Sequence, residues 1–425
     1  MTPEMHCLFL SRLRRISVAT ALAVAAGASA THHASAQSAF QVENEKAGEH
    51  IAGVKPDVVV RSTPANVVWG GLPIGFPAIA TVHSGQVVRI DSLTQEGATS
   101  SALDPVTYYG LFGIPPHEVL PDMIDFWNSI PTRPSFGGGH ILTGPVYIAE
   151  AEPGDVLEIQ LIRFDLRVDY GLNGTSSTSG VFATTYPGIR DGDQPLDIPT
   201  APTGTPGGVV PGVLQHVYHT AKEKGQDVLL FSDDIHVPLQ PFAGTIGLAP
   251  ATGFFEGPTE TSPPPAKGVQ PSTEPGPYGG NMDNRYLTTG TTLFLPVFQP
   301  GGQFFVGDTH SVQADGEVSQ TAVEHSLTGL YRFIVHKDMH LDWPRAENKD
   351  FYIIMGIDQD LNRAMRIATG QVVDFLVNEK GLTVPAAYSL ASVGVNFVVN
   401  EAVDRTQVIS GLIPKSLFLK TPPGH

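Results

Sequence analysis

The stretch Gly144–Leu161, GPVYIAEAEPGDVLEIQL, places a run of apolar residues on each side of a Pro-Gly turn. In both runs apolar and polar residues alternate, which is the period of a strand with one buried face. Val82–Asp91, VHSGQVVRID, repeats this arrangement around a Ser-Gly turn. Each stretch therefore predicts a β-hairpin that belongs to a sandwich or barrel.

Outside these stretches the composition also favours β structure. The chain holds 45 Gly and 36 Pro, which punctuate short strands and structured loops. Helical spacing of apolar residues occurs in Asp358–Glu379, with Asp358 as the expected N-cap and Gly381 as the C-terminal stop. A second helix is expected to start near Pro385 and to cover Ala386–Val393. The fold class is thus mainly β with a smaller α+β part: β-sandwich or barrel-like lobes plus a C-terminal helical segment.

Composition also suggests where the chain divides. Residues 171–212 and 256–278 are rich in Gly, Ser, Thr and Pro. Loops of such length act as lids, as subunit-contact arms or as flexible segments, and composition does not choose among these. The expected division is a signal peptide (1–36), an N-terminal β lobe (37–165), a loop-rich central segment with insertions (166–280) and a C-terminal α+β lobe that carries the main polar site (281–425).

The N-terminus has the three parts of a secretory leader. A basic region around Arg14 and Arg15 precedes the apolar run Ile16–Ala30, and small residues end at Ala36 before Gln37. We expect cleavage after Ala36 and a periplasmic or secreted protein. Because the one cysteine, Cys7, lies in this leader, the mature chain would have no disulfide and no cysteine nucleophile.

The charge balance bears on partners. The chain carries 42 Asp and Glu against 25 Lys and Arg. An acidic surface argues against nucleic acid and anionic membranes as partners. It favours a neutral or cationic small substrate. The sequence also lacks a G-x-S-x-G elbow, a phosphate-binding loop and a dinucleotide fingerprint, so no organic cofactor is expected.

The densest polar stretch is Gly279–Glu324, which opens GGNMDNR and continues to VGDTHSVQADGEVSQTAVE. Its carboxylates and imidazole stand in Gly-punctuated turns, which suggests a metal site, acid–base chemistry, or both. The alternative is a set of Asx turns and N-caps.

Spacing within this stretch points to metal ligation. Asp308 and His310 are two residues apart at the end of an expected strand, so both side chains lie on one face and can share one cation. Asp315 and Glu317 repeat the spacing, and Asp283 can close the site from the preceding loop. The alternative is an Asp that caps a turn and a His that stabilises it.

Glu317 and Glu324 are candidates for proton transfer. A buried Glu with a raised pKa can accept and return a proton at neutral pH. Glu324 lies in an apolar run, TAVEHSLTGLYRF, where an acid needs a partner. The alternative for either residue is a salt bridge, for instance to Arg285 or Arg332.

Several long phrases resemble the acetamidase/formamidase family. They are HILTGPVYIAEAEPGDVLEIQL (140–161), PFAGTIGLAPA (241–251), PGPYGGNMDNRYLTTGTTLFLPV (275–297), GGQFFVGDTHSVQADGEVSQTAVE (301–324) and GLTVPAAYSLASVGVNFVVNEAVD (381–404). Their order also matches that of the family, and they cover most of the chain from about residue 60 to 418.

The resemblance implies an oligomeric, mainly β hydrolase that converts short linear amides to carboxylate and ammonia, with a divalent metal, Zn or Ca. It also implies a set of polar site residues, to which we assign expected roles. Metal ligands are expected at Asp308, His310, Asp283 and His140; catalytic groups at Glu317 (general base), Asp315, Glu324 and Asn281; and substrate-binding groups at Gly279, Gly280 and Gln313.

Two departures from the family pattern lead to a second hypothesis. Where relatives have a His-Trp-Gly phrase, this chain has Val68 before Trp69 and Gly70, and valine neither binds metal nor transfers protons. The chain also carries a leader and insertions at 171–235 and 256–275. A non-catalytic exported binding protein that retains the family fold is therefore the alternative to an enzyme.

Overall fold

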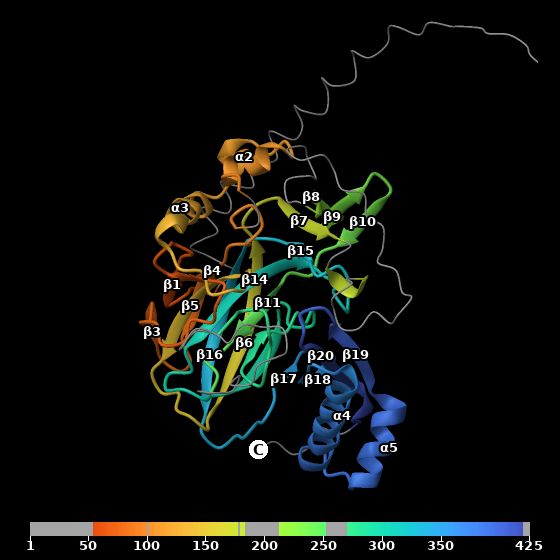
Figure 1. The fold of residues 1–425 in the computed structure, drawn as a ribbon. Coiled ribbons are helices and arrows are strands. Elements are labelled where there is room, and N and C mark those ends of the chain that lie inside the picture. The colour runs from red at the N-terminus through yellow and green to blue at the C-terminus, as the bar shows by residue number, and fades with distance from the viewer. Residues whose placement is uncertain (1–53, 100–101, 177–178, 183–211, 252–269, 420–425) are drawn as a thin grey trace, which may run out of the picture. The chain divides into compact units, whose positions relative to one another are not determined.

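The fold is built on two large β-sheets (Figure 1). The structure is a computed structural model that describes residues 54–99, 102–176, 179–182, 212–251 and 270–419. The expected leader (1–36), and with it the expected cleavage point, lies outside the described residues. In the described ranges no helix is long and apolar enough to cross a membrane.

The first sheet has nine strands in the described ranges. Their order is β1 (Val58–Val60), β4 (Val87–Asp91), β16 (Leu327–His336), β6 (Val156–Leu166), β13 (Thr291–Pro296), β17 (Arg345–Glu347), β18 (Phe351–Asp358), β20 (Gln407–Pro414) and β19 (Asn396–Glu401).

The second sheet has eleven strands in the same ranges. Eight follow one path, β10 (Ile235–Pro238), β9 (Gln226–Ser232), β8 (Leu214–Glu223), β7 (Tyr170–Thr175), β15 (Val323–Glu324), β14 (Phe304–Val312), β11 (Phe242–Gly247) and β12 (Gly279–Asn281). β5 (Ile141–Ile148) pairs with β14, and β2 (Val67–Trp69) and β3 (Ala80–Val82) both pair with β5.

The main core lies between the two sheets. Ile90 and Ile159 come from the first sheet and Ile148, Phe304 and Val306 from the second, and all belong to one buried apolar cluster. Burial of one face of each sheet is what the alternating sequence pattern predicts. The expectation of a mainly β, sandwich-like fold is confirmed.

The two expected hairpins are wrong. β3 pairs with β5, whereas β4 pairs with β1 and β16, so the turn in Val82–Asp91 leads from one sheet to the other. The turn in Gly144–Leu161 does the same, because β5 joins β14 and β6 joins β13 and β16. Alternation identifies a strand with one buried face. In a sandwich, however, the strand after a turn can belong to either sheet, because both sheets bury one face in the same core.

The expected segments also interleave. β16, from the expected C-terminal lobe, lies between β4 and β6, which come from the first 166 residues. The central segment, expected to be loop-rich, holds strands β7 to β11 in its described part. Leu214–Glu223 (LQHVYHTAKE) is β8 although its apolar residues do not alternate, and its pairing with β7 and β9 holds it extended.

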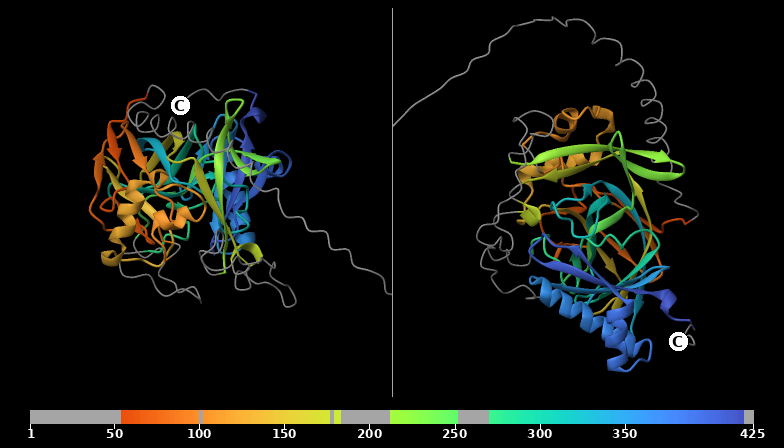
Figure 2. Two further views of the ribbon diagram at one scale, coloured as in Figure 1. Left: turned by 90° about the horizontal axis from the view of Figure 1, so that it is seen from above. Right: turned by 90° about the vertical axis from the view of Figure 1, so that its right-hand side faces the viewer.

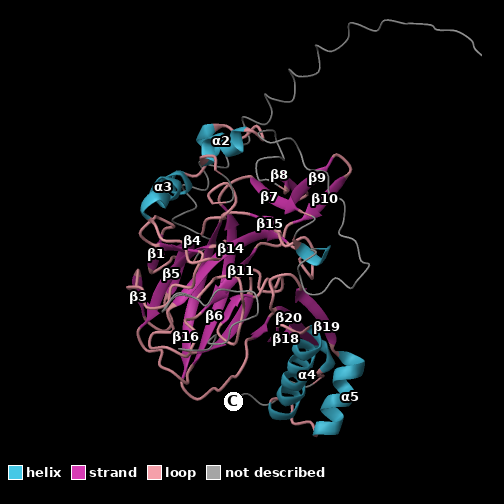
Figure 3. Ribbon diagram, viewed as in Figure 1, coloured by secondary structure: helices cyan, strands magenta, loops and turns pink. Residues whose placement is uncertain are grey.

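The helices lie at the margins of the sheets (Figure 3). α2 (Pro105–Gly110) and α3 (Pro121–Ser129) lie together at one end of the strands, whereas α4 (Leu361–Asn378) packs on β18 and β20 with α5 (Val384–Gly394) beside it, on the opposite side of the molecule (Figure 2). Single 3-10 turns are η1 (Pro116–Glu118), η2 (Ile130–Thr132), η3 (Gly180–Phe182) and η4 (Lys415–Leu417).

Both C-terminal helices are confirmed, with one correction. The N-cap of α4 is Asp360, whose Oδ1 accepts from the N–H of Arg363 at 2.9 Å. Asp358, the expected N-cap, is instead the last residue of β18, where its pairing with Gln407 keeps the chain extended. Gly381 adopts a φ of +69° and its N–H bonds to Val377 O at 3.1 Å, which ends the helix as expected.

α4 packs closely on β18 at one glycine. A Cβ on Gly356 would lie 2.2 Å from Ala368 N and 2.4 Å from Ala364 O. The two alanines are fully buried, so small residues on both elements let the helix approach the sheet. α4 therefore covers the face of β18 and β20 that points away from the main core.

Candidate functional site

Three polar side chains meet where β14 pairs with β15. Asp308 and His310 lie on β14, and Glu324 lies on β15 directly opposite His310. His310 Nε2 is 3.4 Å from Asp308 Oδ1 and 3.4 Å from Glu324 Oε1. All three side chains are almost fully buried. The two-residue spacing of Asp308 and His310 thus brings their side chains together, as predicted.

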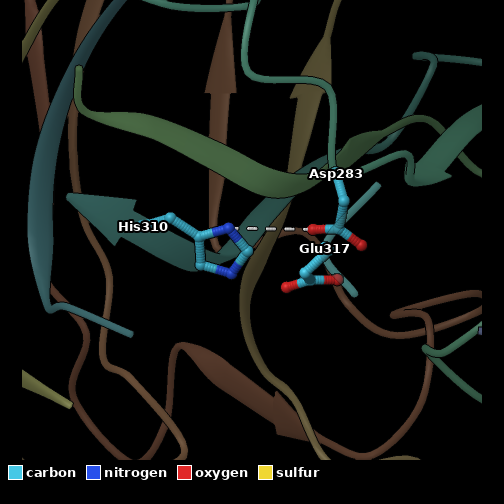
Figure 4. A group of neighbouring side chains, drawn as sticks. All are labelled: Asp283, His310 and Glu317. Carbon is cyan, nitrogen blue, oxygen red and sulfur yellow. Dashed lines mark ion pairs between the residues drawn. The ribbon is translucent and has the colours of Figure 1, made fainter. Parts of the chain in front are cut away.

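Two further carboxylates approach the same imidazole from loops. Asp283 follows β12 and Glu317 follows β14, and Figure 4 shows both side chains pointing toward the His310 ring. Asp283 Oδ1 lies 3.8 Å from His310 Nδ1. Asp283, Asp308 and Glu317 have φ angles of +44°, +48° and +43°. Left-handed backbone at non-glycine residues is costly and clusters at functional sites, so its occurrence at three of these carboxylates supports a functional role for them.

A glycine on β11 makes room for this arrangement. A Cβ on Gly244 would lie 2.3 Å from Asp283 Oδ1 and 2.7 Å from His310 Cε1. Any side chain at position 244 would therefore displace the two groups. Gly244 belongs to the phrase PFAGTIG, and the close approach explains why the strand has a glycine there.

Gln313 fixes the orientation of the imidazole. Its Nε2 donates to the backbone oxygens of Asp283 (2.8 Å) and Asn400 (3.3 Å), which can only accept. Its Oε1 must then be the acceptor for His310 Nδ1, 2.9 Å away. Nδ1 therefore carries a proton, and Nε2 is the atom left to face Asp308 and Glu324. Gln313, for which we expect substrate binding, is thus the residue that orients His310 in this structure.

Burial and neighbouring charge shift the proton affinities in this cluster. Burial raises the pKa of Asp283, Glu317 and Glu324, and carboxylates close by raise it further. Burial also opposes ionisation of Asp308, but His140 and His310 beside it hold its pKa below the usual range. Burial opposes the charged form of His310 too, yet Glu324 and Asp308 raise its pKa well above normal. The cluster thus has more buried acidic groups than positive charge to balance them.

The residues present fit a divalent cation. Both carboxylate oxygens of Asp283 and the Nε2 of His310 are buried and make no hydrogen bond within the described chain. Such atoms are costly unless something outside the chain meets them. Two groups have ligand atoms mutually within 4.8 Å, Asp308 with His310 and Glu324, and Asp283 with His310 and Glu317. Carboxylate and imidazole donors suit Zn²⁺ or, with more oxygens, Ca²⁺.

Other predicted site residues lie around this centre in different roles. His140 Nε2 is 3.7 Å from Asp308 Oδ2, while its Nδ1 is 3.3 Å from Ser272 O. Asp315 is half-buried, and its carboxylate accepts from Tyr286 Oη at 3.0 Å and from Asn400 Nδ2 at 3.3 Å. The structure therefore places His140 beside Asp308, whereas both carboxylate oxygens of Asp315 accept hydrogen bonds from Tyr286 and Asn400.

The β12 residues form the support of the site. Asn281 is buried, its Oδ1 accepts from Thr245, and its Nδ2 donates to Asp404 Oδ2 at 2.6 Å. The N–H of Gly279 donates to Gly276 O at 2.9 Å and so is not free for substrate. A Cβ on Gly279 would lie 2.5 Å from Ile246 O, which accounts for the glycine.

Sequence reasoning missed three residues of this region. Gln95 donates from Nε2 to Asp308 Oδ1 (3.1 Å) and to Glu324 Oε2 (2.9 Å). Glu401 and Asp404 are buried acids at the end of β19, and Asp404, whose pKa burial raises to about 6, also accepts from Gln320 at 2.9 Å. The two acids lie within the phrase NFVVNEAVD, where carboxylates directly after an apolar strand were the available signal. Gln95 stands in no recognisable pattern.

Val68 stands at the position where the family has histidine by the resemblance above. It is buried on β2 and pairs with Leu142, and the next hydrogen bond in this ladder runs from Gly70 N to His140 O. Val68 therefore shares a sheet face with His140 and is its diagonal neighbour.

Comparison with known proteins agrees with this geometry. Residues 265–420 match the model of the acetamidase/formamidase family, and this range contains Asp283, His310 and Glu324. This part of the chain is similar to the acetamidases and formamidases. The resemblance inferred from the sequence is confirmed.

Individual relatives cover different shares of the chain. An acetamidase of Mycolicibacterium smegmatis is 28% identical over 231 residues, 48% of this chain and 53% of that protein. A formamidase of Methylophilus methylotrophus is 24% identical over 198 residues, 42% of this chain and 47% of that protein. The chain spans about half the length of these curated relatives.

The crystal structure of an acetamidase from Yersinia enterocolitica covers 87% of this chain and 95% of its own, with a TM-score of 0.62 and 24% identity. The similarity therefore establishes a shared fold over nearly the whole described chain.

Proposed function

We propose that this protein is an exported hydrolase of short linear amides that converts amide and water to carboxylate and ammonia. The observation that carries the proposal is the buried centre at His310, on which Asp283, Asp308, Glu317 and Glu324 converge. The names of its relatives, acetamidase and formamidase, support the same reaction class.

Asp308, His310 and Glu324 would hold a divalent cation. Their group uses Nε2 of His310, the nitrogen that the bond to Gln313 leaves free. An imidazole nitrogen binds a metal only without a proton, so Nε2 would have to be deprotonated in the loaded site. A bound divalent cation supplies a Lewis acid that polarises the amide carbonyl.

Glu317 is the proposed general base. Hydrolysis requires that a water lose a proton as its oxygen bonds to the carbonyl carbon, and that the leaving nitrogen gain one as the C–N bond breaks. Burial and the nearby Asp283 raise the pKa of Glu317, which makes it a stronger base than an exposed carboxylate. We assign to it the acceptance of the first proton and the return of the second. Asn281 has one Nδ2 hydrogen engaged by Asp404, and we assign the other to the developing oxyanion.

Export and assembly are further parts of the proposal. The leader composition supports cleavage after Ala36 and a periplasmic or secreted location, for which mass spectrometry should find Gln37, or a residue a few positions away, at the N-terminus. An intact Met1 on an active cytoplasmic protein would contradict export. A homo-oligomer is supported by exposed apolar side chains on α5, where Tyr388 is 64% and Val393 81% exposed. Analytical ultracentrifugation tests it.

The second candidate function is a non-catalytic exported binding protein with the family fold. Val68 next to His140 favours it, because a histidine there would add a ligand or proton carrier on the same face. If wild type is inactive and Val68→His gains amide turnover, then the valine at position 68, in place of the family's histidine, is the reason that the wild-type chain has no activity. Turnover by wild type excludes this candidate.

The direct test is ammonia release from acetamide, formamide and propionamide. Wild type should turn over at least one of them, and Glu317→Gln should lower kcat by about 100-fold or more, the usual effect of losing a general base. Glu347→Gln is the matched control, since Glu347 pairs with Lys415 at 3.1 Å in a half-buried surface bridge. Equal activity of wild type and Glu317→Gln would refute the assignment of the base.

A further inference from the structure

Gln95 reaches the polar centre from a distant part of the sequence. It lies in the loop between β4 and α2, and its Nε2 donates to Asp308 Oδ1 at 3.1 Å and to Glu324 Oε2 at 2.9 Å. The loop is anchored on both sides of it: Thr94 N donates to Ser326 Oγ at 3.0 Å, and Thr99 N donates to Gln95 O at 2.9 Å. The Gln95 side chain is therefore held at both ends: the backbone of its loop is anchored by hydrogen bonds, and its Nε2 is bound by two carboxylates.

These contacts decide which way the carboxamide faces. An amide nitrogen carries two hydrogens, and here each has a carboxylate acceptor. The reverse orientation would place Oε1 against two carboxylate oxygens, where it would be repelled. Nε2 therefore faces Asp308 and Glu324, and Oε1 points away from them while remaining at the edge of the same centre, since both atoms are bonded to one carbon.

The other end of this carboxamide has no partner. Oε1 of Gln95 is buried and accepts no hydrogen bond from the described part of the chain. Buried acceptors are rarely left unmet, and leaving one unmet is costly. A rigidly held, unmet acceptor next to the proposed reaction centre is suited to a donor that arrives from outside the chain.

We propose that Gln95 is a specificity-determining residue whose Oε1 accepts a hydrogen bond from the nitrogen of the substrate amide. The inference rests on the proposed amide hydrolysis and adds to it the group that selects an amide nitrogen. An ester of the same shape has an oxygen in place of the N–H and leaves Oε1 unmet. A site built to bond an N–H rejects the analogue that lacks it much more strongly than it would by shape alone.

The test compares acetamide with methyl acetate in four proteins. Wild type, Gln95→Met, Gln95→Glu and the control Gln160→Met are assayed for kcat/KM on both substrates, after thermal unfolding shows that each is folded. Methionine keeps the length of the side chain but has neither strong donor nor strong acceptor. Glutamate keeps an acceptor at the Oε1 position and loses the donor to Asp308 and Glu324. Gln160 bonds Glu158 at 2.8 Å on β6 and lies outside the centre.

The ratio of amide to ester kcat/KM is the decisive quantity. We expect Gln95→Met to lower this ratio by about tenfold, the equivalent of one hydrogen bond. Gln95→Glu should keep the ratio within about threefold of wild type while both rates fall, because the like charge disturbs the two carboxylates. The control Gln160→Met should change neither the ratio nor the two values of kcat/KM.

Other outcomes overturn the proposal in distinguishable ways. If Gln95→Met lowers amide and ester turnover by the same factor, Gln95 only holds Asp308 and Glu324 in place, and its role in specificity is refuted. If wild type releases no ammonia from any amide, the proposed function fails and this inference fails with it. If Gln95→Met does not fold, the ratio of amide to ester kcat/KM is measured on Gln95→Asn instead. Asparagine is one methylene shorter, so its acceptor oxygen lies farther from the substrate and the ratio should fall in the same way. An unchanged ratio would refute the role of Gln95 in specificity.

Discussion

His310 donates its Nδ1 proton to Oε1 of Gln313, 2.9 Å away, and thereby turns its Nε2 toward Asp308 and Glu324. Gln313 itself is held by the backbone oxygens of Asp283 and Asn400. One amide thus connects the loop after β12 with the end of β19 and sets the tautomer of the central imidazole. Partners of this kind tune a histidine ligand without touching the metal.

The first prediction concerns this contact. Gln313→Met should lower cation affinity and amide turnover by about 10-fold to 100-fold each, because the imidazole loses the acceptor that fixes its tautomer. Isothermal titration with Zn²⁺ and ammonia release measure the two effects. Gln160→Met is the matched control and should behave as wild type. Unchanged affinity in Gln313→Met would show that Gln313 does not orient His310.

The polar spacing in GDTHSVQADGE predicted part of this site. Asp308 and His310 are two residues apart on β14, so a local rule predicts that they are neighbours, although the left-handed backbone of Asp308 departs from a regular strand. Glu324 is opposite His310 because β15 pairs with β14, and Gln95 approaches from a loop more than 200 positions earlier. These contacts depend on which strands become neighbours, and the sequence pattern does not encode that. The alternative for Glu317 and Glu324, a salt bridge to Arg285 or Arg332, is not what the described residues show: Arg285 bonds Gln240 and Arg332 bonds Gln160.

For the fold, too, the sequence predicted individual strands and helices but not which strands pair. Alternation identified the strands in Val82–Asp91 and Gly144–Leu161, and helical spacing identified α4 and α5. The partners of β4 and β6 were wrong, because strand pairing is decided by the whole core between the sheets. Asp358 and Asp360 are both good N-caps, and only the pairing of Asp358 with Gln407 selects the later one.

A second prediction tests the packing of α4 on β18. Gly356→Ala should lower the free energy of unfolding by about 1–3 kcal/mol, because its Cβ would lie 2.2 Å from the backbone nitrogen of Ala368. Gly370→Ala is the matched control inside α4, where no atom lies within 4 Å of the added Cβ. It should leave stability unchanged or raise it by up to about 1 kcal/mol. Urea denaturation measures both, and equal effects would contradict the close approach.

A third prediction tests the room left by Gly244. Gly244→Ala should reduce amide turnover by about tenfold or more, since the new Cβ would lie 2.3 Å from Asp283 Oδ1 and 2.7 Å from His310 Cε1. Gly110→Ala, with nothing within 4 Å of the added Cβ, is the control and should keep full activity. Wild-type kinetics in Gly244→Ala would show that Asp283 need not lie so close to His310 for the reaction.

A fourth prediction follows from cysteine content. Removal of the proposed leader would take away Cys7, so the thermal midpoint of the mature protein should be the same with and without a strong reductant. A disulfide is worth about 2–4 kcal/mol, which would give a clear shift. Scanning calorimetry of the protein in both conditions makes the comparison. Because a single cysteine can pair only with a second copy of the chain, a lower midpoint in reductant would mean that Cys7 is retained and links two copies, which would contradict the expected processing.

The central claim is that the buried His310 centre hydrolyses amides with a divalent cation. The most direct measurement is to strip the protein with a chelator, add back Zn²⁺ or Ca²⁺ stepwise, and record bound cation and ammonia release from acetamide, formamide and propionamide in the same samples. We predict that turnover rises with occupancy and saturates at a stoichiometric amount in wild type, while Asp308→Ala neither holds the cation nor turns over. Full turnover without bound cation, or no ammonia from any of the three amides at full occupancy, would contradict the account.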